Sequence, residues 1–339
     1  MPGDTSTIPY PDFDRNTDYI INSQGDTVFL LKNSDQSGAY SVHINLPDKE
    51  EKEVPDHTNL VLVIIIFFVL FMLAVRKSTG PGQEEEEVLT PKMRKKRAED
   101  KAAENGPVYD EWLSKYNPYY KGLNPDMRQR FLLRTIEFAQ VKEFRFHEIE
   151  EKDYMLILIS GAAVQMTFGL KNYLMDYFPV IHVIRKEYTL DYDNETYYGH
   201  VSRNGIYISW NHFLAGYEDY TDSVNVGLHE MAHAVSYDVF LGMQDRHDRK
   251  FKQRLQEFRL EGGPVFRALR QGDNHVLDDY ATTNFDEFWA VCVETFFENP
   301  EEFRNEEPGL YQSICDLLNQ DPTRPDKIID KKIAGITEA

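Results

Sequence analysis

Residues 229–233 read His-Glu-Met-Ala-His, and the spacing of their polar side chains is that of a metal site. On a helix, His229 and His233 lie one turn apart on one face, so two imidazole nitrogens can converge on one tetrahedral metal ion. Glu230 is tilted off the ligand pair and can reach a water on the metal rather than the metal itself. The pattern predicts a one-zinc peptidase with Glu230 as general base.

The residues around this motif are apolar at helical spacing, which predicts a buried helix. They are Val224, Val226, Leu228, Met231, Ala232, Val235 and Val239. Imidazoles and a carboxylate on such a helix cost free energy unless they have partners, and a zinc ion removes that cost. For the motif alone, the alternative is that His229 and His233 are ordinary half-buried helix residues.

A catalytic zinc needs a third protein ligand. The metzincin pattern fails, because it would place Gly and His where this chain has Ser236 and Val239. Further along, Asn284 is a good N-cap and Glu287 falls at the third position of a helix with an inward apolar stripe. Glu287 is therefore a candidate ligand or, alternatively, the reaching partner of a capping box. Weaker ligand candidates are Asp279, Asp286 and Glu294.

Three longer stretches resemble the Mlc titration factor A (MtfA) family of zinc-dependent peptidases. They are residues 205–216, 225–233 and 280–297, and the likeness spans roughly residues 122–318. That family is similar in its active-site helices to the catalytic domain of anthrax lethal factor, a gluzincin. The resemblance implies that Glu287 is the third metal ligand and that Tyr280, seven residues earlier, is a catalytic residue.

The chain departs from the family at Ser236, where an aspartate is usual. Carboxylates behind a metal-binding histidine fix its tautomer and raise its basicity, and their loss typically costs tenfold or more in affinity or rate. We expect either that Asp238 or another acid takes this role, or that activity is modest.

Composition agrees with one catalytic domain and accessory segments, because 339 residues exceed a usual domain. The formal net charge of −20 argues against nucleic acid as a partner. The two cysteines, Cys292 and Cys315, make no disulfide framework. Cys292 lies on the helix of the candidate third ligand and is expected to be a buried, small apolar residue.

Residues 60–75 contain no polar side chain, and they predict a single transmembrane helix over residues 59–76. The run is roughly 24 Å long as a helix, and flanking Arg76 and Lys77 can snorkel to close the gap to a bilayer core. A buried core helix is the alternative. Residues 155–170 look similar, but Ser160, Gly161 and Gln165 indicate a core helix there.

Cations follow the predicted span far more densely than they precede it, so the N-terminus is expected outside the inner membrane and the catalytic domain in the cytoplasm. Residues 1–58 form an acidic tail in which runs at 28–32 and 39–46 suggest a β-hairpin, with disorder as the alternative. Residues 77–106 are expected to be a charged juxtamembrane linker, 107–320 the zinc peptidase domain and 321–339 a C-terminal tail.

Within the domain we expect an α+β fold, a mainly helical zincin-like metallopeptidase with a small sheet. Strand candidates are residues 179–185, 197–202 and 205–210. By gluzincin analogy, the last of these is an edge strand to which an extended peptide adds. The alternative is that Tyr207 and Trp210 belong to the core.

Two functions follow from these patterns. The first is a membrane-tethered zinc metallopeptidase of the HExxH gluzincin type, with one Zn²⁺ per chain and a peptide or protein as substrate. The second is a regulatory interaction protein that sequesters a transcriptional repressor, since members of the resembling family bind the repressor Mlc. Glu230 favours the enzyme, because a structural metal site needs no general base, whereas Ser236 favours the alternative.

Overall fold

The structure is a computed structural model that describes residues 18–21, 27–30, 90–189, 196–241, 249–272, 276–325 and 329. The chain divides into two units, one of Met1–Leu31 with Pro91–Ala339 and one of Lys32–Thr90. The predicted transmembrane helix at 59–76 lies outside the described residues. Among the helices that are described, none is both long and apolar enough to cross a membrane.

The N-terminal half of the described domain is helical: α2 (Pro91–Tyr116), α3 (Pro118–Gly122), α4 (Pro125–Val141) and α5 (Asp153–Thr167). The predicted boundary at 107 falls inside α2, which packs on α4 and α5. Charged residues make up nearly half of α2, and its inward residues are too widely spaced to mark a helix in the sequence. Helix α5 is buried, which confirms the core helix predicted at 155–170.

One four-stranded sheet has the order β3-β4-β8-β7. Its strands are β3 (Glu143–His147), β4 (Val180–Ile184), β7 (Gly199–Ser202) and β8 (Gly205–Ser209). The pairs β3–β4 and β4–β8 are parallel, and β7 is antiparallel to β8. Strands were predicted for β4, β7 and β8, whereas β3 was missed. A small hairpin of β5 (Tyr188–Thr189) and β6 (Thr196–Tyr197) precedes β7.

The prediction that residues 205–210 form an edge strand is wrong. Strand β8 lies between β4 and β7, and all its residues except Tyr207 are buried, so β7 is the edge of the sheet instead. The central position of β8, between the buried strand β4 and the half-buried strand β7, explains its apolar run, which a strand at the edge does not require. Trp210 starts the next helix and is part of the core.

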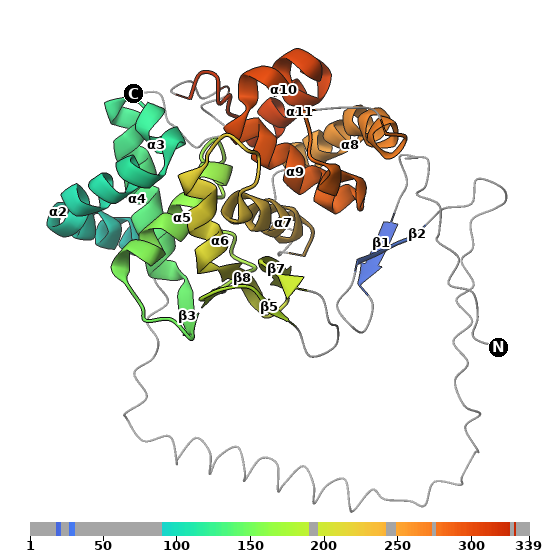
Figure 1. Cartoon of the computed structure of the whole chain (residues 1–339). Coiled ribbons are helices and arrows are strands. Elements are labelled where there is room, and N and C mark those ends of the chain that lie inside the picture. Colours follow the sequence, from blue (N-terminus) through green and yellow to red (C-terminus); the bar gives the residue numbers. More distant parts are fainter. Residues whose placement is uncertain are drawn as a thin grey trace, which may run out of the picture. The chain divides into compact units, whose positions relative to one another are not determined.

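The C-terminal half is also helical, with the short helix η2 (Asp279–Thr282) between α8 and α9. Its α-helices are α6 (Trp210–Glu218), α7 (Val226–Leu241), α8 (Arg249–Arg270), α9 (Phe285–Glu298), α10 (Pro300–Glu306) and α11 (Pro308–Leu318). Helix α7 packs on α5, α9 and the β7–β8 side of the sheet, as Figure 1 shows.

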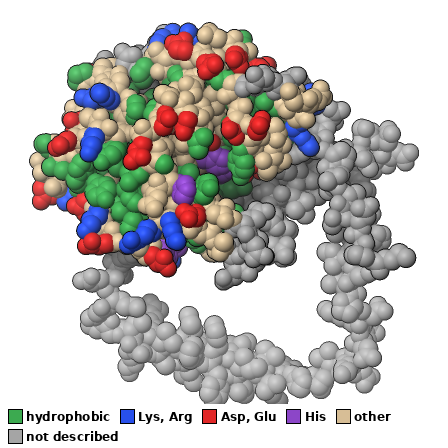
Figure 2. All heavy atoms as spheres, in the orientation of Figure 1, with side chains coloured by type: hydrophobic (Ala, Val, Ile, Leu, Met, Phe, Trp, Pro, Cys, Tyr) green, Lys and Arg blue, Asp and Glu red, His purple; other side chains and the backbone are tan. Residues whose placement is uncertain are grey.

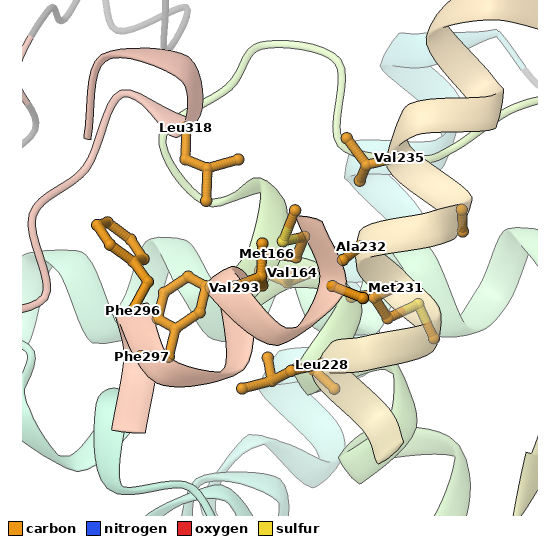
Figure 3. Close-up of a cluster of buried hydrophobic side chains, with 14 of the residues drawn as sticks. Val164, Met166, Leu228, Met231, Ala232, Val235, Val293, Phe296, Phe297 and Leu318 are labelled. Carbon is orange, nitrogen blue, oxygen red and sulfur yellow. The ribbon is translucent and has the colours of Figure 1, made fainter. Parts of the chain in front are cut away.

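Apolar side chains of α5, α7, α9 and α11 meet in one buried cluster around α7 (Figure 3). They include Val164, Met166, Leu228, Met231, Ala232, Val235, Val293, Phe296, Phe297 and Leu318. Burial of each large apolar side chain stabilises the fold by about 1.5–3 kcal/mol. Such packing fixes α7 against α9, and Cys292 contributes to α9 as the buried apolar residue that was predicted.

Two terminal predictions differ from the structure. A hairpin does form near the N-terminus, but β2 (Thr27–Leu30) pairs with the upstream β1 (Asp18–Ile21), and residues 39–46 lie outside the described residues. At the other end, Asp321 is buried and accepts a hydrogen bond from the Tyr311 hydroxyl at 2.7 Å. The folded domain therefore continues past 320, its predicted last residue.

Candidate metal centre

Helix α7 presents the histidine motif from a well-capped start. The side-chain oxygen of Asn225 accepts a hydrogen bond from the Leu228 amide at 3.0 Å, which satisfies an N–H that the first turn leaves without a helical partner. One face of α7 lies in the apolar cluster. His229 and His233 lie beside it, with side chains that are 15% and 11% exposed. The predicted buried helix is therefore confirmed.

Helix α9 brings Glu287 to these histidines. Asn284 caps α9, since its side-chain oxygen accepts hydrogen bonds from the Asp286 and Glu287 amides at 2.9 and 3.0 Å. The Glu287 carboxylate turns to the imidazoles instead of completing a capping box. Its Oε2 lies 2.9 Å from His229 Nε2 and 3.4 Å from His233 Nε2.

These three side chains fit a zinc ion. One ligand atom from each of His229, His233 and Glu287 lies within 4.8 Å of the others, and the two Nε2 atoms are 3.2 Å apart. A tetrahedral ion with bonds of about 2.05 Å separates its ligands by roughly 3.3 Å. Two imidazoles and one carboxylate are also a donor set of catalytic zinc sites. Asp279, Asp286 and Glu294 are not in this group.

The charges of the site favour a cation. Burial alone would lower the pKa of His229, but Glu294 and Glu287 raise that pKa well above its ordinary value. Burial likewise opposes ionisation of Glu287, yet hydrogen bonds to His229 and His233 hold its pKa well below the usual range. Positive charge between these groups is stabilised, and a divalent ion supplies it.

Glu230 lies beside these three side chains, and the hydrogen bonding of its carboxylate is incomplete among the described residues. Its side chain is buried, and its Oε2 has no hydrogen-bond partner among the described residues. Burial raises the pKa of this carboxyl to about 7. A carboxylate with a pKa near the working pH suits general base catalysis.

Behind His229 stands a carboxylate whose position the sequence did not reveal. Glu294 Oε1 lies 2.7 Å from His229 Nδ1, and Glu294 Oε2 accepts a hydrogen bond from the Asn225 amide at 2.5 Å. Glu294 therefore lies outside the group of three candidate ligands and instead contacts the distal ring nitrogen of His229. Asp238 Oδ1 accepts a hydrogen bond from the Tyr177 amide at 2.9 Å, and its expected orienting role stays a prediction.

Three glutamates form one stripe along α9, at positions i, i+7 and i+11. Glu287 contacts the histidines, Glu294 orients His229, and Glu298 Oε1 accepts a hydrogen bond from the Asn225 side-chain amide at 2.9 Å. This spacing in the sequence could have placed Glu294 on the same face of α9 as Glu287. Trp289 adds a further link, since its indole N–H donates to the Ala232 carbonyl at 3.0 Å.

Tyr280 lies at the outer side of the site on η2. The residue is 53% exposed, and its ring centroid is 5.9 Å from that of His229. Asp278 caps η2 through the Tyr280 amide, and Asp279 is exposed. The ring of Tyr280 therefore lies beside the His229 imidazole at the solvent-exposed side of the site.

The ligand set beside a buried, unpartnered carboxylate is that of a metal-dependent hydrolase. Residues 91–318 match the glucose-regulated metallo-peptidase M90 family, and the chain belongs to that family of metallopeptidases. An uncharacterized protein of Synechocystis sp. is similar, with 26% identity over 214 residues that cover 58% of this chain and 78% of that protein. The family indicated by the sequence motifs is confirmed, and the likeness to anthrax lethal factor stays a prediction.

Proposed function

We propose that this chain is a zinc metallopeptidase that hydrolyses peptide bonds with Glu230 as general base. The observation that carries the proposal is the buried Oε2 of Glu230, which has no partner among the described residues and lies beside His229, His233 and Glu287. Leaving a buried carboxylate oxygen without a partner costs free energy, and beside a group that could hold a metal ion, a catalytic role toward a bound water accounts for it.

Each residue of the site then has a defined part. His229, His233 and Glu287 hold one zinc ion per chain, which when bound supplies the Lewis acidity that activates water. Glu230 accepts the proton of the attacking water on its carboxylate and delivers it to the leaving amine. The Tyr280 hydroxyl donates a hydrogen bond to the oxyanion that develops at the scissile carbonyl.

The substrate class is a peptide or protein in extended conformation, bound along β7. The Ser209 amide donates to the Tyr198 carbonyl at 2.8 Å, so Tyr198 and His200 direct their main-chain groups toward β8. The main-chain groups of Gly199 and Val201 consequently face the outer edge, where no strand pairs among the described residues. A peptide added to this edge gains main-chain hydrogen bonds beside the metal site.

The alternative, a regulatory protein that sequesters a transcriptional repressor, is not favoured by this arrangement. A metal site that serves only to hold the fold has no use for a carboxylate in the position of Glu230. Glu294 also supplies the orienting acid whose absence at Ser236 had argued for a weak site.

We further propose that residues 59–76 tether the domain to the inner membrane, with the N-terminus outside and the peptidase in the cytoplasm. The uninterrupted apolar run and the cations that follow it support this orientation. Protease added to intact, right-side-out cells should trim an N-terminal tag and spare a C-terminal one. Cleavage of the C-terminal tag while the membrane is intact would show the inverted topology.

Glu230→Gln in the full-length chain tests the catalytic proposal. The variant should retain about one zinc per chain and lose peptide hydrolysis by orders of magnitude, because an amide cannot accept the proton. Glu257→Gln, an exposed glutamate on α8, is the matched control and should behave as the unaltered protein. Unaltered hydrolysis by Glu230→Gln, or loss of its zinc, would overturn the role of Glu230.

A further inference from the structure

Gly199 opens the edge strand β7, and the shape of the backbone does not explain why it is a glycine. The described glycines with positive φ are Gly205 and Gly272, and Gly199 is not among them. A residue with a side chain could therefore adopt the backbone conformation at 199 without strain. The reason for glycine must lie in what surrounds it.

Glu230 occupies the space that a side chain at 199 would take. A Cβ atom there would lie 2.5 Å from Glu230 Oε1, 2.6 Å from its Cγ and 2.7 Å from its Cδ. All three distances are shorter than carbon and oxygen atoms tolerate without displacement. Glu230 is only 5% exposed, so a side chain at 199 is accommodated by moving this carboxylate.

We propose that Gly199 is the positioning residue of the general base: the bare backbone of the edge strand seats the Glu230 carboxylate beside the three metal-binding side chains. This inference rests on the proposed function, since it assigns Gly199 a part in the same reaction.

The position of Gly199 also links the base to the substrate. A side chain at position 199 would point to the face of the sheet toward α7, whereas the N–H and C=O of Gly199 point along the sheet to the open edge. A peptide that pairs with these main-chain groups is therefore held by the same residue against which the base rests. The distance between scissile carbonyl and base is set through one residue of the scaffold.

Gly199→Ala in the full-length chain separates positioning from binding. The added methyl group points at Glu230 and not at the edge, so KM and zinc content should stay unchanged while kcat falls about 100-fold, the cost of a misplaced catalytic group. Gly122→Ala is the matched control, because a Cβ there meets only Pro325 Cγ, at 3.5 Å. Unchanged kcat in Gly199→Ala, or loss of its zinc, would overturn the inference.

A double-mutant cycle on thermal unfolding tests the contact without any activity measurement. With the metal chelated, Gly199→Ala should lower the unfolding midpoint by a few degrees in the natural background and leave it unlowered when Glu230→Ala has made room. Equal shifts in the two backgrounds would refute the contact and with it the inference. An active Glu230→Gln variant would instead refute the proposed function, and the two failures are distinguishable.

Discussion

The molecule carries two groups of histidines that differ in their neighbours. His229 and His233 lie on α7 against the glutamates of α9. The other group crosses one face of the sheet, where the rings of His182 and His200 stack on either side of Tyr207, each at 4.1 Å. His147 extends this row, with its Nε2 2.9 Å from His182 Nδ1.

The surroundings of His229 and His182 shift the pKa values of these two histidines in opposite directions. Carboxylates raise the pKa of His229, whereas burial, His147 and Arg145 lower that of His182. Figure 2 shows histidine side chains reaching one face of the domain at more than one place, yet among the described residues only the α7 histidines form, with a carboxylate, a group that could hold a metal ion. Imidazoles become a metal centre when another element supplies the anion, and otherwise they pack as aromatic rings.

Removal of the Glu287 carboxylate should have the largest effect on metal binding. Glu287→Gln keeps the start of α9, because glutamine also suits the third helical position, but it should lower zinc affinity by more than about 100-fold. Competition with a chelator of known affinity measures the change. His147→Ala, in the sheet group, should leave zinc affinity unchanged. Equal affinity in Glu287→Gln would assign the third ligand to another acid.

Each histidine group has a tyrosine beside it, Tyr280 at His229 and Tyr188 at His200. Tyr280→Phe should lower kcat by about 100-fold and leave zinc in place, since it removes a hydroxyl directed at the oxyanion. Tyr188→Phe removes the hydroxyl that contacts His200 Nδ1 at 2.7 Å, and it should leave kcat unchanged. Steady-state kinetics on both variants would contradict the assignment if the two substitutions had the same effect.

Glu294→Gln should have a smaller effect on metal binding than Glu287→Gln. The amide oxygen can still accept the hydrogen bond of the Asn225 backbone, but the orienting charge on His229 Nδ1 is lost. Outer partners of metal ligands typically contribute about 10- to 100-fold in affinity, and a loss in this range is expected by zinc titration. No loss would mean that His229 keeps its orientation through packing alone.

The smallest effect concerns the sheet histidines and is a change in stability with pH. The pKa of His182 is lowered from 6.5 in the folded state, chiefly by burial, so the unfolded chain binds a proton first. Stability is fully present above about pH 6.5 and is lost as pH falls below it. His182→Gln should flatten the fall of the unfolding midpoint between about pH 7 and about pH 5. An identical fall in both proteins would contradict the assignment.

The sequence predicted best what depends on neighbours along one helix. Helical spacing placed His229 beside His233, and the cap at Asn284 placed Glu287 near the start of α9. Strand order was not predictable in this way, because the edge position of β7 depends on pairing between segments far apart in the chain. Strand β3 was predictable from the sequence, because its five residues alternate exposed polar side chains with half-buried aromatic rings, a pattern that indicates a half-buried strand.

Glu294 shows a second limit of what the sequence alone can predict. Its spacing from Glu287 put both on one face of α9, but the sequence alone could not state whether the second acid would meet the metal or the far nitrogen of a ligand. That choice depends on how α9 lies against α7, which the apolar cluster around Met231 and Val293 determines.

The glutamate stripe of α9 also makes metal loading a test of correct assembly. Its three contacts extend over roughly 16 Å of helix, from the metal ligands to the capped start of α7. A slip of α9 by one residue would break all of them together and bring its buried carboxylates into apolar surroundings. Only molecules in which the two helices have paired in the native register can bind the ion, and the free energy of unfolding of the loaded molecules rises with the logarithm of the ion's affinity.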